Sequence, residues 1–150
     1  MSDKKIQKLF TDKGFGFAIH IVNAPMIKVR GKWVLKLNFE KYEKAVLMAL
    51  AHKQCRLSGN EIKFIRNYFE LSLKEFGKRF GDVAHSAVIK WEKKKDAATS
   101  MNWACEKDIR LYVINFLDPS YLRRLYSELE EVASEKITKI RLEAKEIKAA

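Results

Sequence analysis

The sequence predicts a mainly α, α+β protein in three parts, and three features of its 150 residues predict it. Alternation of apolar and polar residues, which indicates strands, is confined to the first quarter of the chain. Helical spacing with two capping signals dominates the middle. Beyond Pro119 there is neither Gly nor Pro. We therefore expect a small N-terminal β-hairpin or meander with one helix over 1–57, a helical bundle with a helix-turn-helix over 58–117, and a long C-terminal helix over 118–150.

Two strands are expected in the N-terminal part, after a polar and basic stretch, 1–13, that we expect to be frayed. The stretches 15–22 and 26–38 are rich in β-branched and alternating apolar residues, and Asn23-Ala24-Pro25 separates them. Gly31, inside the second stretch, indicates a turn or a bulge.

One helix and one basic face complete this part. Asn38 is a suitable N-cap for a helix from Phe39 to about Ala51. The alternation in the second strand puts four cations on one face, and this face either contacts phosphates or an acidic partner protein, or is simply solvated. The cations are Lys28, Arg30, Lys32 and Lys36.

The middle part opens its first two helices with capping boxes. Ser58 and Glu61 are spaced so that the hydroxyl and the carboxylate each satisfy a backbone amide at a helix start. Ser72 and Glu75 repeat this spacing at the next helix. The middle part is therefore predicted to begin with two helices of known starting points.

The second of these helices is short. It runs over 73–80, because Gly81 provides a left-handed stop. Two further helices are expected over about 84–93 and about 101–117. The segment from Leu71 to Lys95 therefore has the spacing of a helix-turn-helix, two short helices joined by a tight turn. Its apolar anchors are Phe76, Phe80, Val83, Val88 and Trp91.

The C-terminal part is predicted to be one helix that starts at Asp118 and Pro119. Its apolar residues form a narrow seam, which is typical of a helix that packs on a partner helix, and we expect it to set a homodimer. The alternative is a helix that folds back on its own domain. The seam residues are Leu122, Tyr126, Leu129, Ala133, Ile137, Ile140, Ala144 and Ile147.

The helix-turn-helix segment resembles the Cro/lambda-repressor (XRE-type) family. The pattern is Leu71-Ser72-x-x-Glu75-Phe76-Gly77-x-x-Phe80-Gly81, then Val83 and Val88-x-x-Trp91-Glu92. The stretch 57–66 resembles the helix that precedes the pair, so the resemblance covers 57–117. It implies a lambda-repressor-like bundle with a recognition helix at about 84–93. The chain departs from the pattern at Asp82, which lengthens the turn, and at Leu73, where many members have a phosphate-binding Gln.

A second resemblance concerns the small β-containing unit ahead of the Leu57-Ser58-Gly59-x-Glu61 helix, which is similar to MqsA-type antitoxins and their relatives. It implies a cognate toxin as a protein partner and repression of the protein's own operon. In that type the N-terminal unit is a zinc site made of two CxxC pairs. No cysteine precedes Cys55 here, so no metal is carried over.

The resemblance to the Cro/lambda-repressor family implies which residues touch DNA. A recognition helix presents its N-terminal residues to base edges in the major groove. Those positions are His85, Ser86, Ile89 and Lys90. Phosphate contacts are expected from Ser72 and Lys74 at the start of the second helix, and from Lys93, Lys94 and Lys95 after the recognition helix.

Charge supports a polyanionic partner. The formal net charge is +11, with +6 in residues 1–50, +5 in 51–100 and 0 in 101–150. We expect a sequence-specific regulator of transcription, a repressor, that binds double-stranded DNA as a homodimer. The antitoxin of a type II toxin–antitoxin system is the more specific hypothesis. The alternative is a nonspecific or RNA-binding basic module.

Other classes of protein are disfavoured. HExxH, GxSxG and a Gly-rich phosphate loop are missing, so we expect no enzyme and no cofactor. No apolar run approaches about 18 residues, so we expect no membrane partner. Two cysteines without a CxxC pair favour the cytoplasm, with the protein on the nucleoid when it binds DNA.

Overall fold

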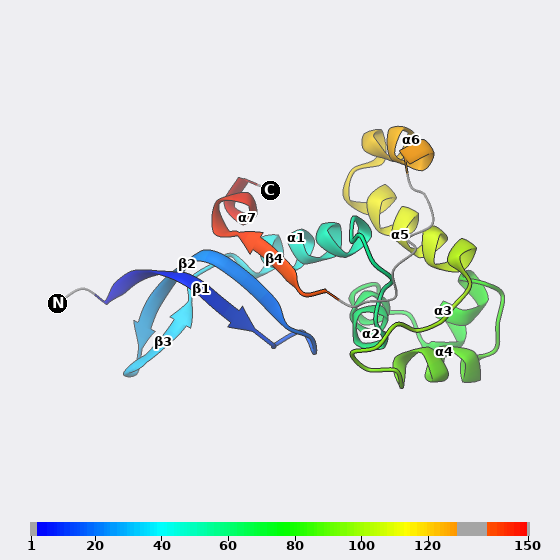
Figure 1. The fold of residues 1–150 in the computed structure, drawn as a ribbon, viewed down its shortest axis with the longest axis horizontal. Coiled ribbons are helices and arrows are strands. Elements are labelled where there is room, and N and C mark those ends of the chain that lie inside the picture. Colours follow the sequence, from blue (N-terminus) through cyan, green and yellow to red (C-terminus); the bar gives the residue numbers. More distant parts are fainter. Residues whose placement is uncertain (1–2, 129–137, 150) are drawn as a thin grey trace. The chain divides into compact units, whose positions relative to one another are not determined.

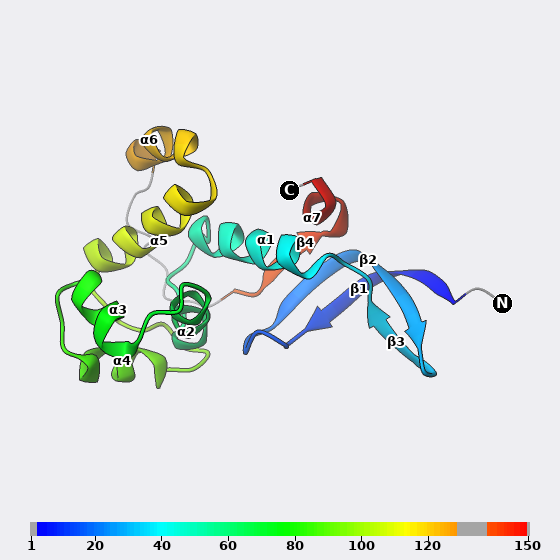
Figure 2. The same ribbon diagram turned by 180° about the vertical axis from the view of Figure 1, so that it is seen from behind.

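The computed structural model describes residues 3–128 and 138–149, and in that part of the chain it contains seven helices and four strands (Figures 1 and 2). These elements divide into two compact units. The sheet unit comprises residues 1–46 and 139–150, and the helical unit comprises residues 47–138. Helix α1 (Phe39–Ala51) contributes residues to both, and Asn38 Oδ1 caps it by accepting from the Lys41 N–H at 2.9 Å.

The sheet unit is built around its longest strand, β2 (Ile19–Val29). β1 (Lys4–Asp12) runs antiparallel along one edge of β2. The other edge is shared by two strands. β3 (Lys32–Leu35) pairs antiparallel with the second half of β2, and β4 (Ile140–Glu143) pairs parallel with the first half.

One face of this sheet, the inner face, is buried. Ile19 and Ile21 of β2 are fully buried, and the buried Ile140 and Leu142 of β4 lie beside them in register. The alternation changes phase at Asn23, whose φ is +55°, so that the next buried residues on β2 are Ala24 and Met26. The left-handed residue allows one strand to keep its apolar residues on one face along its whole length.

Two helices cover the inner face. α7 (Ala144–Ala149) contacts β2 and β4 and buries Ile147. From α1, the Tyr42 hydroxyl donates a hydrogen bond to Asp12 Oδ2 at 2.6 Å, on the end of β1. Burial and this hydrogen bond raise the pKa of Tyr42 well above its ordinary range.

The helical unit contains the end of α1 and five further helices. They are α2 (Gly59–Tyr68), α3 (Leu73–Arg79), α4 (His85–Glu92), α5 (Trp103–Leu117) and α6 (Pro119–Glu128). The capping boxes predicted at Ser58 and Ser72 are both present. Apolar residues from α1 to α5 form the core, among them Leu50, Ile62, Ile65, Phe76, Phe80, Val88, Ile109 and Val113.

A buried ionic network holds the segment between α1 and α2 against α5. The Arg110 guanidinium is 1% exposed and donates to the carbonyls of Lys53 and Cys55 and to Glu106 Oε2. Glu106 also accepts from the Leu57 N–H at 3.2 Å. Burial raises the pKa of Glu106, and the Arg110 charge opposes that shift. The network orders an irregular segment by satisfying its carbonyl groups.

The prediction of a mainly α fold with a long C-terminal helix is wrong. The structure is α+β, with a mixed four-stranded sheet among the described residues. Residues 140–143 form β4 instead of continuing a helix. The reason is tertiary pairing: Ile140 and Leu142 are buried beside β2, which outweighs local helical spacing. Leu129, Ala133 and Ile137 of the predicted seam lie outside the described residues.

The strand boundaries also differ from the prediction. Residues 4–12, expected to be frayed, form β1, and β2 continues through Asn23-Ala24-Pro25. The Pro25 carbonyl accepts from the Lys36 N–H at 2.8 Å, just beyond the last residue of β3. Pro25, which has no N–H to donate, is tolerated because the pairing of β2 with β3 ends at this position. Arg30 and Gly31, with φ of +51° and +79°, form the two-residue turn between β2 and β3.

Candidate nucleic-acid interface

α3 and α4 pack directly on one another through a glycine (Figure 1). A Cβ atom added at Gly77 of α3 would lie 2.6 Å from the carbonyl oxygen of Val83 and 3.1 Å from Val88 Cγ2. The Val83 N–H donates to the carbonyl of Gly77 at 2.9 Å. The turn before α4 is therefore fixed against the backbone of α3, and α4 has one position relative to α3.

The turn itself contains two consecutive left-handed residues. Gly81 has a φ of +85°, which agrees with its predicted role as a helix stop, and Asp82 has a φ of +49°. A Cβ at Gly81 would lie 3.2 Å from Cys105 Sγ of α5. Burial raises the pKa of the Cys105 thiol to about 11, with smaller contributions from Asp108 and Glu106. The thiol behind the turn is therefore protonated near neutral pH.

The N-terminus of α4 is open. The cap residue Ala84 makes no side-chain hydrogen bond, and the first turn of α4 contains no acidic residue. His85, Ser86 and Lys90 are exposed, and Ile89 is half-buried. The amides and the positive end of the helix dipole are therefore accessible to an anion or to acceptors on a base edge.

Three lysines follow α4 in a fixed loop. Lys93, Lys94 and Lys95 are all exposed. The N-terminus of α2 holds this loop, because the Asn60 N–H donates to the Lys95 carbonyl at 2.9 Å. Gly59 permits the approach, since a Cβ there would lie 2.4 Å from the carbonyl oxygen of Trp91.

The start of α3 differs from the start of α4. Ser72 and Lys74 are both exposed, as a phosphate contact requires. The Ser72 N–H, however, donates to Glu75 Oε1 at 3.0 Å, and Ser72 Oγ accepts from the Glu75 N–H at 3.0 Å. These hydrogen bonds lower the pKa of Glu75, so an ionised carboxylate occupies this helix start. Of the two, the α4 N-terminus is the more suitable for an anion.

The structure places the predicted contact residues on two neighbouring helices and the loop after them. The segment 71–95 contains seven Lys and Arg against three Asp and Glu, a net charge of +4. All nine predicted contacts are exposed except Ile89, which is half-buried. They are Ser72, Lys74, His85, Ser86, Ile89, Lys90, Lys93, Lys94 and Lys95.

The predicted basic strand face does not exist as one face. Arg30 lies in the turn, and Lys28 is opposite Trp33, in phase with the buried Met26 on the inner face. Lys32 is opposite Val29 on the other side of the sheet. The reason is the hairpin. A two-residue turn divides the predicted strand 26–38, so the alternation of its residues does not place the cations on one face.

Sequence reasoning missed the pair that holds α4 in place. Arg66 of α2 and Glu92 of α4 form a bidentate ion pair with both side chains mostly buried. Their separation of 26 positions corresponds to no local pattern, so no signal in one sequence pairs them. Glu92 entered the sequence argument only as the last residue of the helix-turn-helix motif.

No protein-family model, no curated protein and no solved structure matches this chain. Over 3–128 and 138–149, no group of three or more His, Cys, Asp and Glu side chains could hold a metal ion. In the same residues, no helix combines the length and the apolar character that crossing a membrane requires.

Proposed function

We propose that this protein is a sequence-specific DNA-binding regulator of transcription that inserts α4 into the major groove. The observation that supports it best is the open N-terminus of α4. It is the exposed, uncapped start of a helix, without a nearby carboxylate in its first turn, and three lysines follow the helix. α2 and α3, whose starts are closed by their own Glu residues, lack this property.

The exposed side chains on α4 have the chemistry that base edges require. The major groove of B-DNA is about 12 Å wide and accepts one α-helix. Lys90 can donate to guanine O6 or N7, and His85 and Ser86 can donate to or accept from base edges. Ile89 can contact a thymine methyl group. Specificity in this proposal comes from side chains that lie on one helix, fixed by Gly77 and by the Arg66–Glu92 pair.

Phosphate contacts supply affinity without sequence preference. Lys93, Lys94 and Lys95 are suited to this role, because the loop that carries them is hydrogen-bonded to the N-terminus of α2. Lys74 is a further exposed cation on α3. In this arrangement, base contacts from α4 and phosphate contacts from the loop involve different residues, and mutation can separate the two.

The proposal is tested by selecting randomised duplex DNA with the purified full-length protein. We expect one sequence to be enriched, and the variant His85→Ala/Lys90→Ala to lose at least tenfold in the ratio of specific to nonspecific affinity. The control Lys63→Ala, which removes an exposed cation of α2, should leave that ratio unchanged. Absence of an enriched sequence, or a preference that survives the double substitution, would contradict the assignment of α4.

The same experiment tests two further predictions, homodimer binding and RNA binding. Homodimer binding predicts an inverted repeat with half-sites about 10 base pairs apart, but the long helix expected to set the dimer does not form. The RNA-binding alternative predicts that single-stranded or duplex RNA competes with the duplex DNA at similar concentration. Equal competition would favour a nonspecific basic module.

A further inference from the structure

The face of the sheet opposite the buried one, the outer face, is apolar and lacks a covering element among the described residues. Cross-strand pairing puts Ile6 beside Pro25 and Val34 beside Ile27 on this face. Of the six large hydrophobic residues that are exposed in the described part of the chain, three belong to it: Ile6, Val29 and Val34. Ile6 is the most exposed at 72%. An exposed patch of this kind marks an interaction site more often than scattered exposed residues do.

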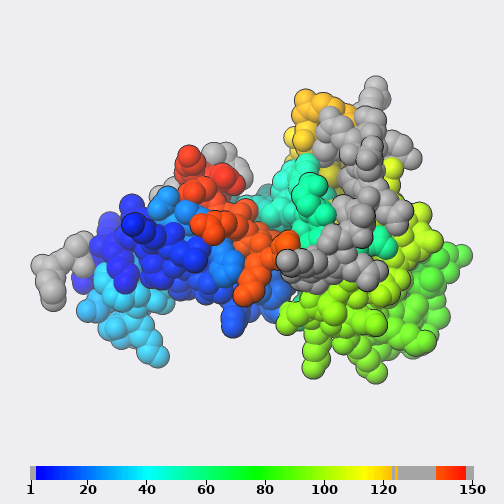
Figure 3. All heavy atoms as spheres, viewed as in Figure 1, coloured from blue at the N-terminus to red at the C-terminus, as the bar shows by residue number. Residues whose placement is uncertain are grey.

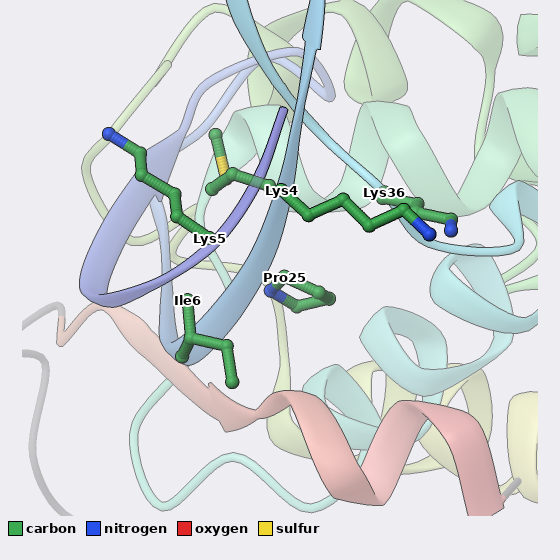
Figure 4. A pocket seen from close by; sticks show the side chains of 6 residues that line it. Lys4, Lys5, Ile6, Pro25 and Lys36 are labelled. Atoms are coloured by element: carbon green, nitrogen blue, oxygen red, sulfur yellow. The ribbon is translucent and has the colours of Figure 1, made fainter. Parts of the chain in front are cut away.

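A depression lined by three lysines lies beside these residues. Its volume is about 400 Å³, and Lys4, Ile6, Pro25 and Lys36 line it together with Lys5 and Met26. Lys36 continues β3 and is held opposite Pro25 by its hydrogen bond to the Pro25 carbonyl. In Figure 4 the side chains of Lys4 and Lys36 extend in the same direction, above Pro25 in this view. Positive charge therefore borders the apolar surface.

β1 is also an edge strand. It pairs with β2 on one side, and no strand of the described chain pairs with its other side. Figure 3 shows atoms of β1, in dark blue, at the surface of the sheet unit. Among the described residues, the outer face is therefore open at the β1 edge of the sheet.

The positive charge of the sheet unit indicates which kind of partner the outer face binds. The sheet unit contains 14 Lys and Arg against 6 Asp and Glu, so it carries +8 of the net +11 in 58 of the 150 residues. β1 itself carries Lys4, Lys5 and Lys8. A second copy of this chain would bring together two surfaces that each carry a net positive charge, which is unfavourable. A nucleic acid would neutralise the lysines but would leave Ile6 and Val34 without an apolar partner.

We propose that the outer face binds an extended acidic segment of another protein, which lies across β1, β2 and β3. That segment would place carboxylates near Lys4 and Lys36 and aliphatic side chains on Ile6 and Val34. The lysines select for negative charge, and the aliphatic residues supply apolar burial. This proposal is independent of DNA binding by α4.

The test is selection of a random twelve-residue peptide library displayed on phage against the full-length protein. We expect enriched peptides that combine Asp or Glu with Val, Ile or Leu. Their affinity should fall at least tenfold for Lys4→Glu/Lys36→Glu and for Ile6→Ser/Val34→Ser. The matched control Lys13→Glu/Lys145→Glu makes the same charge change at exposed positions away from the outer face and should change affinity less than twofold.

Three outcomes overturn the proposal. The first is the absence of enriched peptides, or enrichment of peptides that bind all variants equally. The second is a dimer, seen by sedimentation, that Ile6→Ser/Val34→Ser converts to monomer, since the occupant is then a second copy. The third concerns binding of a random 20-base-pair duplex. If Lys4→Glu/Lys36→Glu lowers this affinity as much as Lys93→Gln/Lys94→Gln/Lys95→Gln does, the outer face belongs to a nucleic-acid interface. Circular dichroism confirms beforehand that each variant is folded.

Discussion

The guanidinium of Arg66 and the carboxylate of Glu92 join α2 to α4 through two parallel hydrogen bonds. Nε lies 2.6 Å from Oε2 and Nη2 lies 3.1 Å from Oε1. Nη1 of the same guanidinium donates to the carbonyl of Leu71, just before α3, at 3.0 Å. One side chain of α2 thus contacts α4 and the residue before the N-cap of α3, and it is 14% exposed, so solvent screens the pair weakly.

The first prediction concerns this pair. Glu92→Gln keeps the shape of the side chain but removes its charge, and we expect the free energy of unfolding to fall by about 1–3 kcal/mol. Urea denaturation measures the change. A double-mutant cycle with Arg66→Gln gives the coupling energy of the pair. This energy should exceed the coupling energy of the exposed Arg79–Asp108 pair, which we expect to be below about 1 kcal/mol. Equal coupling energies would mean that the Arg66–Glu92 pair stabilises the fold no more than an exposed ion pair does.

Gly77→Ala tests the close approach of α3 to the turn. In an unconstrained helix interior this change stabilises by about 1 kcal/mol. Here the new Cβ would lie 2.6 Å from a backbone oxygen, that of Val83, which cannot move without displacing the turn. We expect a loss of more than about 2 kcal/mol in thermal or urea unfolding. Lys78→Ala, at the next and exposed position, is the control and should change stability by less than about 0.5 kcal/mol.

The Cys105 thiol should react slowly in the folded protein. Its pKa is raised to about 11, because it is buried and faces Asp108 and Glu106. At pH 8 the thiolate fraction is then about 100-fold below that of a cysteine with a pKa of 9, the ordinary value. Alkylation by iodoacetamide, followed by mass spectrometry, should be slower in buffer than in urea by at least that factor. Similar rates in the two solvents would contradict the burial of this thiol behind Gly81.

Local sequence signals predicted the helices well, for physical reasons. A capping box involves residues three apart, so the starts of α2 and α3 follow from Ser58 and Ser72 alone. α1 begins and ends at the predicted residues, Phe39 and Ala51. At the candidate site, the α4 positions were those that the resemblance to the Cro/lambda-repressor family implies. They are exposed except the half-buried Ile89, and Val88 beside it is fully buried.

The sheet could not be predicted in the same way. Ile140, Ala144 and Ile147 satisfy helical spacing, and what makes Ile140 part of a strand is its partner Ile19, 121 positions earlier. The edge strand β1 is polar because only one of its edges and part of one face are covered. Non-local pairing decides both elements. The same is true of Arg110, whose carbonyl partners lie 55 or more positions away.

The last prediction separates phosphate contacts from base contacts. Each phosphate contact steepens the dependence of log K on log salt by about 0.9. If all three lysines after α4 contact phosphates, Lys93→Gln/Lys94→Gln/Lys95→Gln should reduce the slope by about 2.7 and leave the ratio of specific to nonspecific affinity nearly unchanged. Fluorescence anisotropy of a labelled duplex, titrated across salt concentrations, measures both quantities.

The control for this experiment removes the same charge elsewhere. Lys13→Gln/Lys41→Gln/Lys145→Gln changes three exposed cations of the sheet unit, none of them on its outer face. If long-range net charge governs binding, both triple variants reduce the slope equally, and the loop after α4 has no special role. If only the loop variant does so, the cations act by contact. The loop is held by Asn60 and Gly59 at the start of α2, so these contacts should form without an ordering cost.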